Sequence, residues 1–323
     1  MSLIGHAWAL RHLQRQRQLG QLRQSYLLLG PEQVGKTTLA LTFAMGLYCE
    51  SPTSPRPCGQ CRVCRRIQRS AYPDVLVIEP GGSSFTIEQV RELEAELPLT
   101  PREGSVKTRI LCGFDAATRE AQNALLKTLE EPPSHALLFL TAAERDLLAP
   151  TIISRCQTLA MRPVPAAELT QALEECGLPP AEAEALARQS SGRPGWALRA
   201  LEDPGLRERR ALALRDAGEL LNCRPAARLA YSEALGARDR GTVIELLRLW
   251  QLWWHDELLV CEGAKAGFVL APDERPPCVA SLAAGDAARF LRHLAEIEAM
   301  IQRNVNLRLA LNVLVLRMPH LPK

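Results

Sequence analysis

The chain has 323 residues, a formal net charge of +3 from 39 basic and 36 acidic side chains, and a hydrophobic content of 47%. That length predicts two or three domains, and that apolar content excludes global disorder. The longest stretch without a charged residue, 37–49, has 13 residues and is too short to cross a bilayer, and the N-terminus lacks a secretory signal, so we expect a cytoplasmic protein with no membrane partner.

Strands and helices alternate through the first half of the chain. Short apolar runs predict strands at 25–29, 74–79, 107–112 and 136–141, and 157–161 is a fifth candidate. Helical spacing predicts helices at 36–48, 87–97 and 118–130, the second of them opened by a capping box from Thr86 to Gln89. This alternation favours an α/β fold in which a mainly parallel sheet is covered on both faces.

The second half of the chain is predicted to be all-α. From Pro163 onward no further β-alternation occurs, and Ala, Leu, Glu and Arg dominate between Gly- and Pro-rich breaks. We therefore expect three domains: an α/β domain at 1–162, a small helical unit at 163–205 and a larger helical unit at 206–323.

A phosphate-binding loop follows the first predicted strand. Residues 30–37 (GPEQVGKT) fit the pattern G-x-x-x-x-G-K-[ST] at every fixed position: Gly30, Gly35, Lys36 and Thr37. The glycines allow backbone N–H groups to face phosphate, the lysine reaches the β- and γ-phosphates, and the threonine hydroxyl completes a Mg²⁺ shell. With Thr38, these residues predict binding of ATP or ADP with Mg²⁺. The alternative is a Gly-rich turn with a chance lysine.

Nucleotide hydrolysis requires more than this loop. It needs an acidic strand end that holds Mg²⁺ and orients water. The strand predicted at 107–112 ends without an Asp-Glu pair, and Asp115 is the carboxylate nearest to its tip. Two interpretations of Asp115 stay open, a metal partner or a turn and helix-capping residue, and the sequence around it favours the second. No competent hydrolytic base is visible.

Four cysteines form a predicted metal site. Cys49, Cys58, Cys61 and Cys64 lie within sixteen residues and offer the four thiolates of a closed tetrahedral zinc site, which is structural because no coordination position is left open. An iron–sulfur cluster is the rival interpretation, but the fourth cysteine and proline of a ferredoxin run are missing after Cys64. Absence of a metal is the third.

Other features are predicted to be structural. The remaining six cysteines, listed here, are expected to be small buried residues: Cys112, Cys156, Cys176, Cys223, Cys261 and Cys278. The basic stretch 11–23 is interpreted as a solvated helix face rather than a DNA contact. Trp250, Trp253 and Trp254 share one helical stripe, which predicts a core or a subunit interface.

These elements, in this order, resemble the bacterial clamp-loader AAA+ subunits of DNA polymerase III. The resemblance rests on the phosphate loop, on the cysteines inserted after its helix, and on the segments 123–133 (NALLKTLEEPP) and 153–156 (ISRC). It covers at least residues 25–160. More loosely, 191–198 resembles the lid of these proteins, and 304–311 resembles the helix of the collar through which their subunits oligomerise.

Two kinds of subunit within this family are similar to the chain. The tau/gamma motor is expected to carry an Asp-Glu pair where Cys112 and Gly113 stand, and a sensor arginine where Gly195 stands, although Arg193 and Arg199 are close. Both departures favour the delta-prime type, in which the nucleotide site is often degenerate. The intact phosphate loop departs in the other direction, and it leaves open that ATP or ADP is bound without turnover.

The resemblance gives Arg155 a role. In this family the arginine of the Ser-Arg-Cys motif is supplied in trans to the ATP of a neighbouring subunit, where a guanidinium neutralises charge on the γ-phosphate. From the sequence alone, Arg155 is interpreted as a surface arginine at the end of a helix.

The resemblance also implies partners and a function. We expect a delta-prime-like subunit that helps ATP-driven loading of the sliding clamp on primed DNA, together with the tau/gamma and delta subunits, and that is itself a weak or inactive ATPase. The alternatives are a tau/gamma-type ATPase motor and a zinc adaptor with a vestigial phosphate loop.

Overall fold

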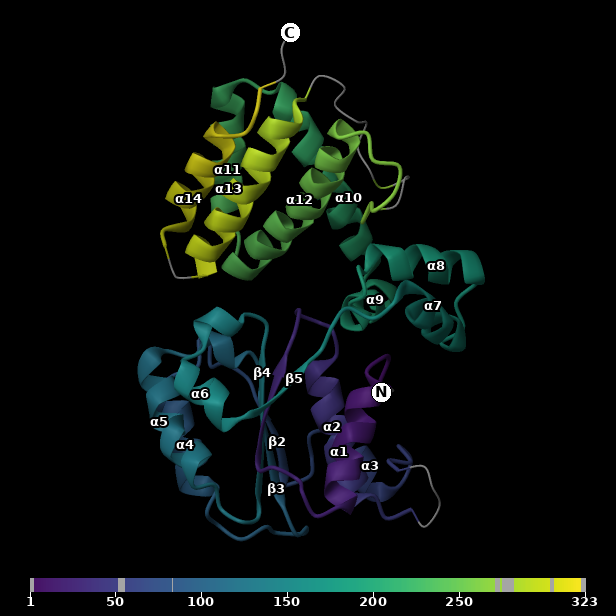
Figure 1. Cartoon of the computed structure of the whole chain (residues 1–323), viewed down its shortest axis with the longest axis vertical. Helices are drawn as coiled ribbons and strands as arrows, with labels where there is room; N and C mark the ends of the chain where they lie inside the picture. The colour runs from purple at the N-terminus through teal and green to yellow at the C-terminus, as the bar shows by residue number, and fades with distance from the viewer. Residues whose placement is uncertain are drawn as a thin grey trace. The chain divides into compact units, whose positions relative to one another are not determined.

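The computed structural model describes residues 3–51, 56–82, 84–270, 274, 282–302 and 305–320. The chain forms two compact units, residues 1–196 and 197–323, and the boundary falls inside helix α9 (Pro194–Glu202). Figure 1 shows the α/β unit and the all-helical unit. The predicted division into α/β and all-α parts is thereby confirmed, while the three-domain division at 162 and 205 stays a prediction.

The first unit contains a five-stranded sheet. Its strands are β1 (Ser25–Leu29), β2 (Val75–Ile78), β3 (Lys107–Leu111), β4 (Ala136–Ala142) and β5 (Gln157–Ala160). Their order is β2-β3-β4-β1-β5, and every neighbouring pair is parallel. The fifth strand is confirmed. Because all strands run the same way, the sheet has one edge made of strand starts and one made of strand ends.

Helices cover both faces of this sheet (Figure 1). One face packs against α1 (Ala7–Gln18) and α2 (Lys36–Tyr48), with α3 (Arg62–Gln68) beside α2. The other packs against α4 (Ile87–Glu96), α5 (Arg119–Glu130) and α6 (Pro150–Arg155). Strand residues alternate between the faces: Tyr26 and Leu28 belong to the first core, and Leu27 belongs to the second.

Local sequence signals explain where several helices begin. The Thr118 side chain accepts the N–H of Ala121 at the start of α5 (3.2 Å), and the Gln89 side chain accepts the N–H of Thr86 at the start of α4 (3.3 Å). In the basic N-terminal stretch, α1 buries Ala9 and Leu13 and leaves its arginines at the surface.

The lid region of the first unit contains α7 (Ala166–Glu175) and α8 (Pro180–Gln189), which pack against each other. Leu169, Leu173 and Leu186 are fully buried there. Cys176 ends α7 and is exposed, so the prediction of a buried thiol is wrong at this position: the helix stops there and turns at Gly177. Cys156 is buried as predicted, and Cys278 lies outside the described residues.

The second unit is helical throughout its described part. It contains α10 (Pro204–Glu219), α11 (Pro225–Gly236), α12 (Arg240–Cys261), α13 (Ala284–Gln302) and α14 (Leu307–Leu316). Trp250, Trp253 and Trp254 are completely buried on α12, and the ring of Trp254 lies 4.6 Å from that of Phe290. The tryptophan stripe is therefore core. Within the described ranges, no helix is long and apolar enough to cross a membrane.

Candidate functional site

The phosphate loop connects the end of β1 to the start of α2. A Cβ atom at Gly30 would lie 2.1 Å from the carbonyl oxygen of Met161, so only glycine fits between β1 and the end of β5. Gly35 precedes α2 with a φ of 108°, a conformation that favours glycine. The predicted loop therefore has the backbone that its glycines suggested.

Lys36 is folded onto this loop. Its Nζ donates to the carbonyl oxygens of Gly30 (2.5 Å) and Pro31 (2.8 Å), and the residue is only 9% exposed. Thr37 and Thr38 follow on the first turn of α2 and are half-buried. The structure thus brings the five predicted nucleotide-binding residues together at the end of β1, with the N-terminus of α2 behind them.

Cys112 occupies the strand end opposite Thr37. The Thr37 hydroxyl lies 3.3 Å from the Cys112 sulfur, immediately after β3. Burial raises the pKa of the Cys112 thiol, so this position carries no negative charge near neutral pH. A carboxylate at this place would meet a Mg²⁺ ion held by the threonine, and a neutral thiol is a poor ligand for that hard cation.

Asp115 has a structural role close by. Its carboxylate accepts the backbone N–H groups of Ala143 and Glu144, each at 2.8 Å, and so braces the turn after β4. This is the turn function that the sequence favoured.

The lid reaches the phosphate loop through Gly195. Its N–H donates to the carbonyl oxygen of Gln33 at 2.9 Å. A Cβ atom at Gly195 would lie 3.0 Å from that oxygen, closer than most real contacts. The position at which the family resemblance places a sensor arginine is therefore a glycine packed directly on the loop.

His6 was missed by sequence reasoning. Its Nε2 lies 3.1 Å from the carbonyl oxygen of Val34, and burial lowers the pKa of this histidine despite that contact. Since it is a single histidine in a segment without a recognisable pattern, nothing in the sequence indicated that it lies against the loop.

The four predicted metal ligands come together. The sulfur atoms of Cys49, Cys58, Cys61 and Cys64 all lie within 4.8 Å of one another. Around a tetrahedral zinc ion with Zn–S bonds of about 2.3 Å, sulfur atoms are roughly 3.8 Å apart, so the cluster fits such an ion. The helix α3 begins directly after Cys61 and carries Cys64.

Backbone N–H groups already point at three of these sulfurs. Cys58, Cys61 and Cys64 donate to the sulfurs of Cys49, Cys58 and Cys61, at 3.4, 3.3 and 3.4 Å. Hydrogen bonds from Gln60 and Cys61 lower the pKa of Cys58 to about 6, whereas burial raises the pKa of Cys64 to about 12. A bound metal requires thiolates, so it would displace the Cys64 proton.

The cysteine module is attached to the loop before β3 at both of its ends. Tyr48, which precedes Cys49, donates its hydroxyl to the carbonyl oxygen of Val106 (2.5 Å). Arg66, which follows Cys64, forms two bonds to the carboxylate of Glu103, at 2.6 and 2.8 Å. Sequence reasoning gave neither contact.

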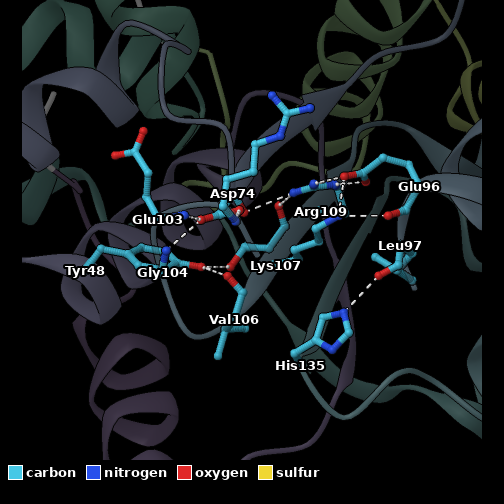
Figure 2. A network of polar contacts seen from close by, with 12 residues as sticks. Tyr48, Asp74, Glu96, Leu97, Glu103, Gly104, Val106, Lys107, Arg109 and His135 are labelled. Atoms are coloured by element: carbon cyan, nitrogen blue, oxygen red, sulfur yellow. Dashed lines mark hydrogen bonds and ion pairs between the residues drawn. The ribbon is translucent and has the colours of Figure 1, made fainter. Parts of the chain in front are cut away.

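A buried polar network holds the same loop from the sheet side (Figure 2). The carboxylate of Asp74 accepts the N–H groups of Arg102, Glu103 and Gly104, at 2.7, 2.8 and 2.7 Å. Although burial alone would raise it, these bonds lower the pKa of Asp74 below its ordinary value. Figure 2 also shows Lys107 and Arg109 reaching Glu96, at 2.5 and 2.9 Å.

Arg155 ends α6, just before β5. Its Nε donates to Glu130 Oε1 at 2.9 Å, its Nη2 forms an ion pair with the same carboxylate, and its Nη1 donates to the carbonyl oxygen of Thr151 at 3.0 Å. The side chain is 31% exposed. It lines an open pocket of about 610 Å³ that also includes Arg23 and Gln157. Arg155 is therefore reachable from outside.

Comparison with known proteins identifies the family. Residues 5–165 match the family model described as DNA polymerase III, delta subunit. Over 212 residues the chain is 37% identical to DNA polymerase III subunit delta' of Pseudomonas aeruginosa, covering 64% of both chains. Over 172 residues it is 33% identical to DNA polymerase III subunit tau of Escherichia coli, covering 53% of this chain and 27% of tau.

Two further matches are a sequence relative and a solved structure. DNA polymerase III subunit delta' of Bacillus subtilis is 34% identical over 171 residues, which is 53% of this chain and 52% of that protein. A gamma-subunit-related protein of Thermotoga maritima superposes with a TM-score of 0.42 at 17% identity, over 94% of this chain and 97% of that one. The sequence matches span less than two thirds of the length of these relatives. On the family model and these sequence relatives, residues 5–165 belong to the family of DNA polymerase III clamp-loader subunits that includes the delta-prime and tau/gamma proteins.

Proposed function

We propose that this chain acts as a delta-prime subunit of a clamp loader, and that it supplies Arg155 to the nucleotide of a neighbouring subunit. Its partners would be the tau/gamma and delta subunits, the sliding clamp and primed DNA, in the cytoplasm. The observation that carries this proposal is the position of Arg155 relative to the chain's own phosphate loop.

That position weighs against action of Arg155 on a nucleotide bound to the chain's own phosphate loop. In the register of β1 with β5, Tyr26 lies opposite Gln157 and Leu29 lies opposite Ala160. Arg155 precedes the start of β5, and Gly30 follows the end of β1. The two are separated by about 15–20 Å along the strands, at about 3.3 Å per residue. An arginine side chain cannot span that distance, which supports the proposal that Arg155 acts on a nucleotide bound by another molecule.

The nucleotide site supports binding without hydrolysis. The phosphate loop is formed by the two glycines, Lys36, Thr37 and Thr38. If ATP or ADP binds there, Thr37 and the phosphates would hold its Mg²⁺ ion. A motor subunit is expected to have an acidic residue at 112 and a sensor arginine at 195, and this chain has a neutral thiol and a glycine there. We infer a weak or inactive ATPase. This observation also weighs against the tau/gamma motor alternative.

The cysteine module is proposed to hold a structural zinc ion. Four converging sulfurs and no open ligand position support this role. Metal analysis of freshly purified protein should find about one zinc per chain. Less than half an equivalent, or iron in its place, would contradict the assignment. Chelation should lower the melting temperature of the native protein.

The decisive experiment uses the assembled complex. Arg155→Ala should remove the DNA-stimulated hydrolysis at the neighbouring site, where an arginine finger contributes about 10³–10⁵-fold in rate. ATP binding by the complex should persist, because the group acts on the transition state. Steady-state ATPase with primed DNA and clamp measures the loss.

Arg145→Ala provides the matched control. It removes an exposed arginine from the same domain, in the short turn at 145–147. If Arg155→Ala retains the full stimulated rate, as the control should, Arg155 is a surface residue and the proposal fails.

A further inference from the structure

The C-terminal end of α5 carries an unusual pair of acids. Glu130 is the last residue of the helix, and Glu131 follows before Pro132. The C-terminal end of a helix has partial negative charge, which disfavours carboxylates there. Residues that break a local preference often serve a function. For Glu130, the contact that compensates is Arg155.

Glu130 holds the guanidinium on one edge. Its Oε1 accepts from both Nε and Nη2 of Arg155, while the carbonyl oxygen of Thr151 accepts from Nη1. The group is thus held from two sides, by α5 and by its own helix. A guanidinium has five N–H donors, and these three bonds together with a longer contact of Nη1 with the Ser154 hydroxyl (3.4 Å) leave at least one donor for an anion entering the pocket. Glu130 is the one acidic residue among the described residues that line it.

The backbone segments that carry Glu130 and Arg155 are anchored by buried neighbouring residues. Leu129, next to Glu130, and Ile152, one turn before Arg155, are buried in the same core. Cys156, next to Arg155, is buried as well, and burial raises the pKa of its thiol to about 12. The remaining freedom of Arg155 lies in its side-chain torsions, which Glu130 restricts.

We propose that Glu130 is a positioning residue for Arg155: it fixes the plane of the guanidinium before the neighbouring nucleotide arrives. The inference rests on the proposed function of Arg155. An ion pair between partly exposed side chains contributes little to folding, so its loss should spare the fold. Orientation matters far more for catalysis, since a displacement of about 1 Å can cost 10²-fold in rate.

The test measures DNA-stimulated ATPase of the assembled complex with Glu130→Gln, Glu130→Asp and Arg155→Ala. The loss of rate caused by Arg155→Ala is the reference with which the Glu130 variants are compared. Glu130→Gln should show most of that loss through kcat, with an unchanged KM for ATP. Glu130→Asp should recover part of it. Glu131→Gln, which changes the adjacent exposed acid, should keep the full rate. All variants should melt like the parent protein.

A double variant separates positioning from other effects. Glu130→Gln combined with Arg155→Ala should be no slower than Arg155→Ala alone, because Glu130 acts through the arginine. If Arg155→Ala is active, the proposed function fails. If Arg155→Ala is impaired but Glu130→Gln matches the parent, the finger stands and the positioning role is wrong. A faster Glu130→Gln complex would also overturn it, because the acid would then restrain the arginine.

Discussion

The two edges of the parallel sheet carry contrasting sites. The edge of strand ends holds the phosphate loop, and there a thiol stands where Mg²⁺ would need a carboxylate. The edge of strand starts holds Arg155 with Glu130, and Asp74 with its three N–H donors. At the first edge, the Cys112 thiol offers no charge to a Mg²⁺ ion beside Thr37, whereas at the second edge Arg155 is paired with Glu130.

The two edges differ in the charged groups that they carry. In open parallel sheets, ligands bind at the strand ends. This chain keeps the loop and its Lys36 but has a thiol and a glycine at 112 and 195, and its Arg155 lies at the opposite edge, bound to Glu130 and 31% exposed. The contrast supports the proposal that the chain completes the site of another molecule. Three substitutions test this contrast.

The largest expected effect is on the edge of strand starts. Asp74→Asn replaces a buried carboxylate that accepts three N–H groups, and should lower the free energy of unfolding by about 3 kcal/mol. Because the folded-state pKa is lowered, the stabilisation is present above about pH 4, the unfolded value, and is lost as pH falls through the folded pKa.

Urea unfolding across pH measures this effect. The gap between the parent protein and Asp74→Asn should close below pH 4. Asp146→Asn, at an exposed position, should show no gap at any pH. A gap of constant size would mean that Asp74 is not ionised in the fold.

The next effect is on the phosphate loop. Lys36→Ala should weaken ATP binding by at least about tenfold, or about 1.4 kcal/mol, because a buried ammonium that faces the loop is lost. Lys127→Ala, an exposed lysine of α5, should bind like the parent. Calorimetric titration of the purified chain measures both. Millimolar or weaker binding by the parent would favour the vestigial loop.

The smallest effect is on Cys112. Cys112→Asp restores a carboxylate beside Thr37 and should tighten ATP binding in Mg²⁺ by about two- to fivefold, roughly 0.5–1 kcal/mol. Cys112→Asn has the same size without the charge and should give no gain. Equal affinities for the two variants, with and without Mg²⁺, would show that the thiol is not at the metal position.

Local patterns were readable from the sequence, and long-range pairings were not. The strand at 25–29, the helix at 36–48 and the phosphate loop were predicted because apolar runs and glycines mark their ends within the chain itself. The four cysteines converge because their spacing is short.

Contacts between distant segments carry no comparable signal. Glu130 and Arg155 are 25 residues apart, and Arg66 and Glu103 are 37 apart. Each pair joins exposed charges of which the chain has many, so only the packing of α5 on α6, or of the cysteine module on the loop before β3, selects the partner. For the pair of Glu130 and Arg155, the two adjacent acids at the end of α5 were the one feature of the sequence that pointed to a basic partner.

The buried tryptophans of α12 also make the second unit optically distinct. Three of the five tryptophans are fully enclosed there, whereas the first unit has Trp8, which is 47% exposed, and its last residue, Trp196, which is 6% exposed. Buried tryptophans emit at shorter wavelengths than solvent-exposed ones. The emission maximum should therefore move to longer wavelength chiefly when residues 197–323 unfold. Fluorescence would then report chiefly on unfolding of the helical unit, while the Asp74 and Lys36 variants change the other unit.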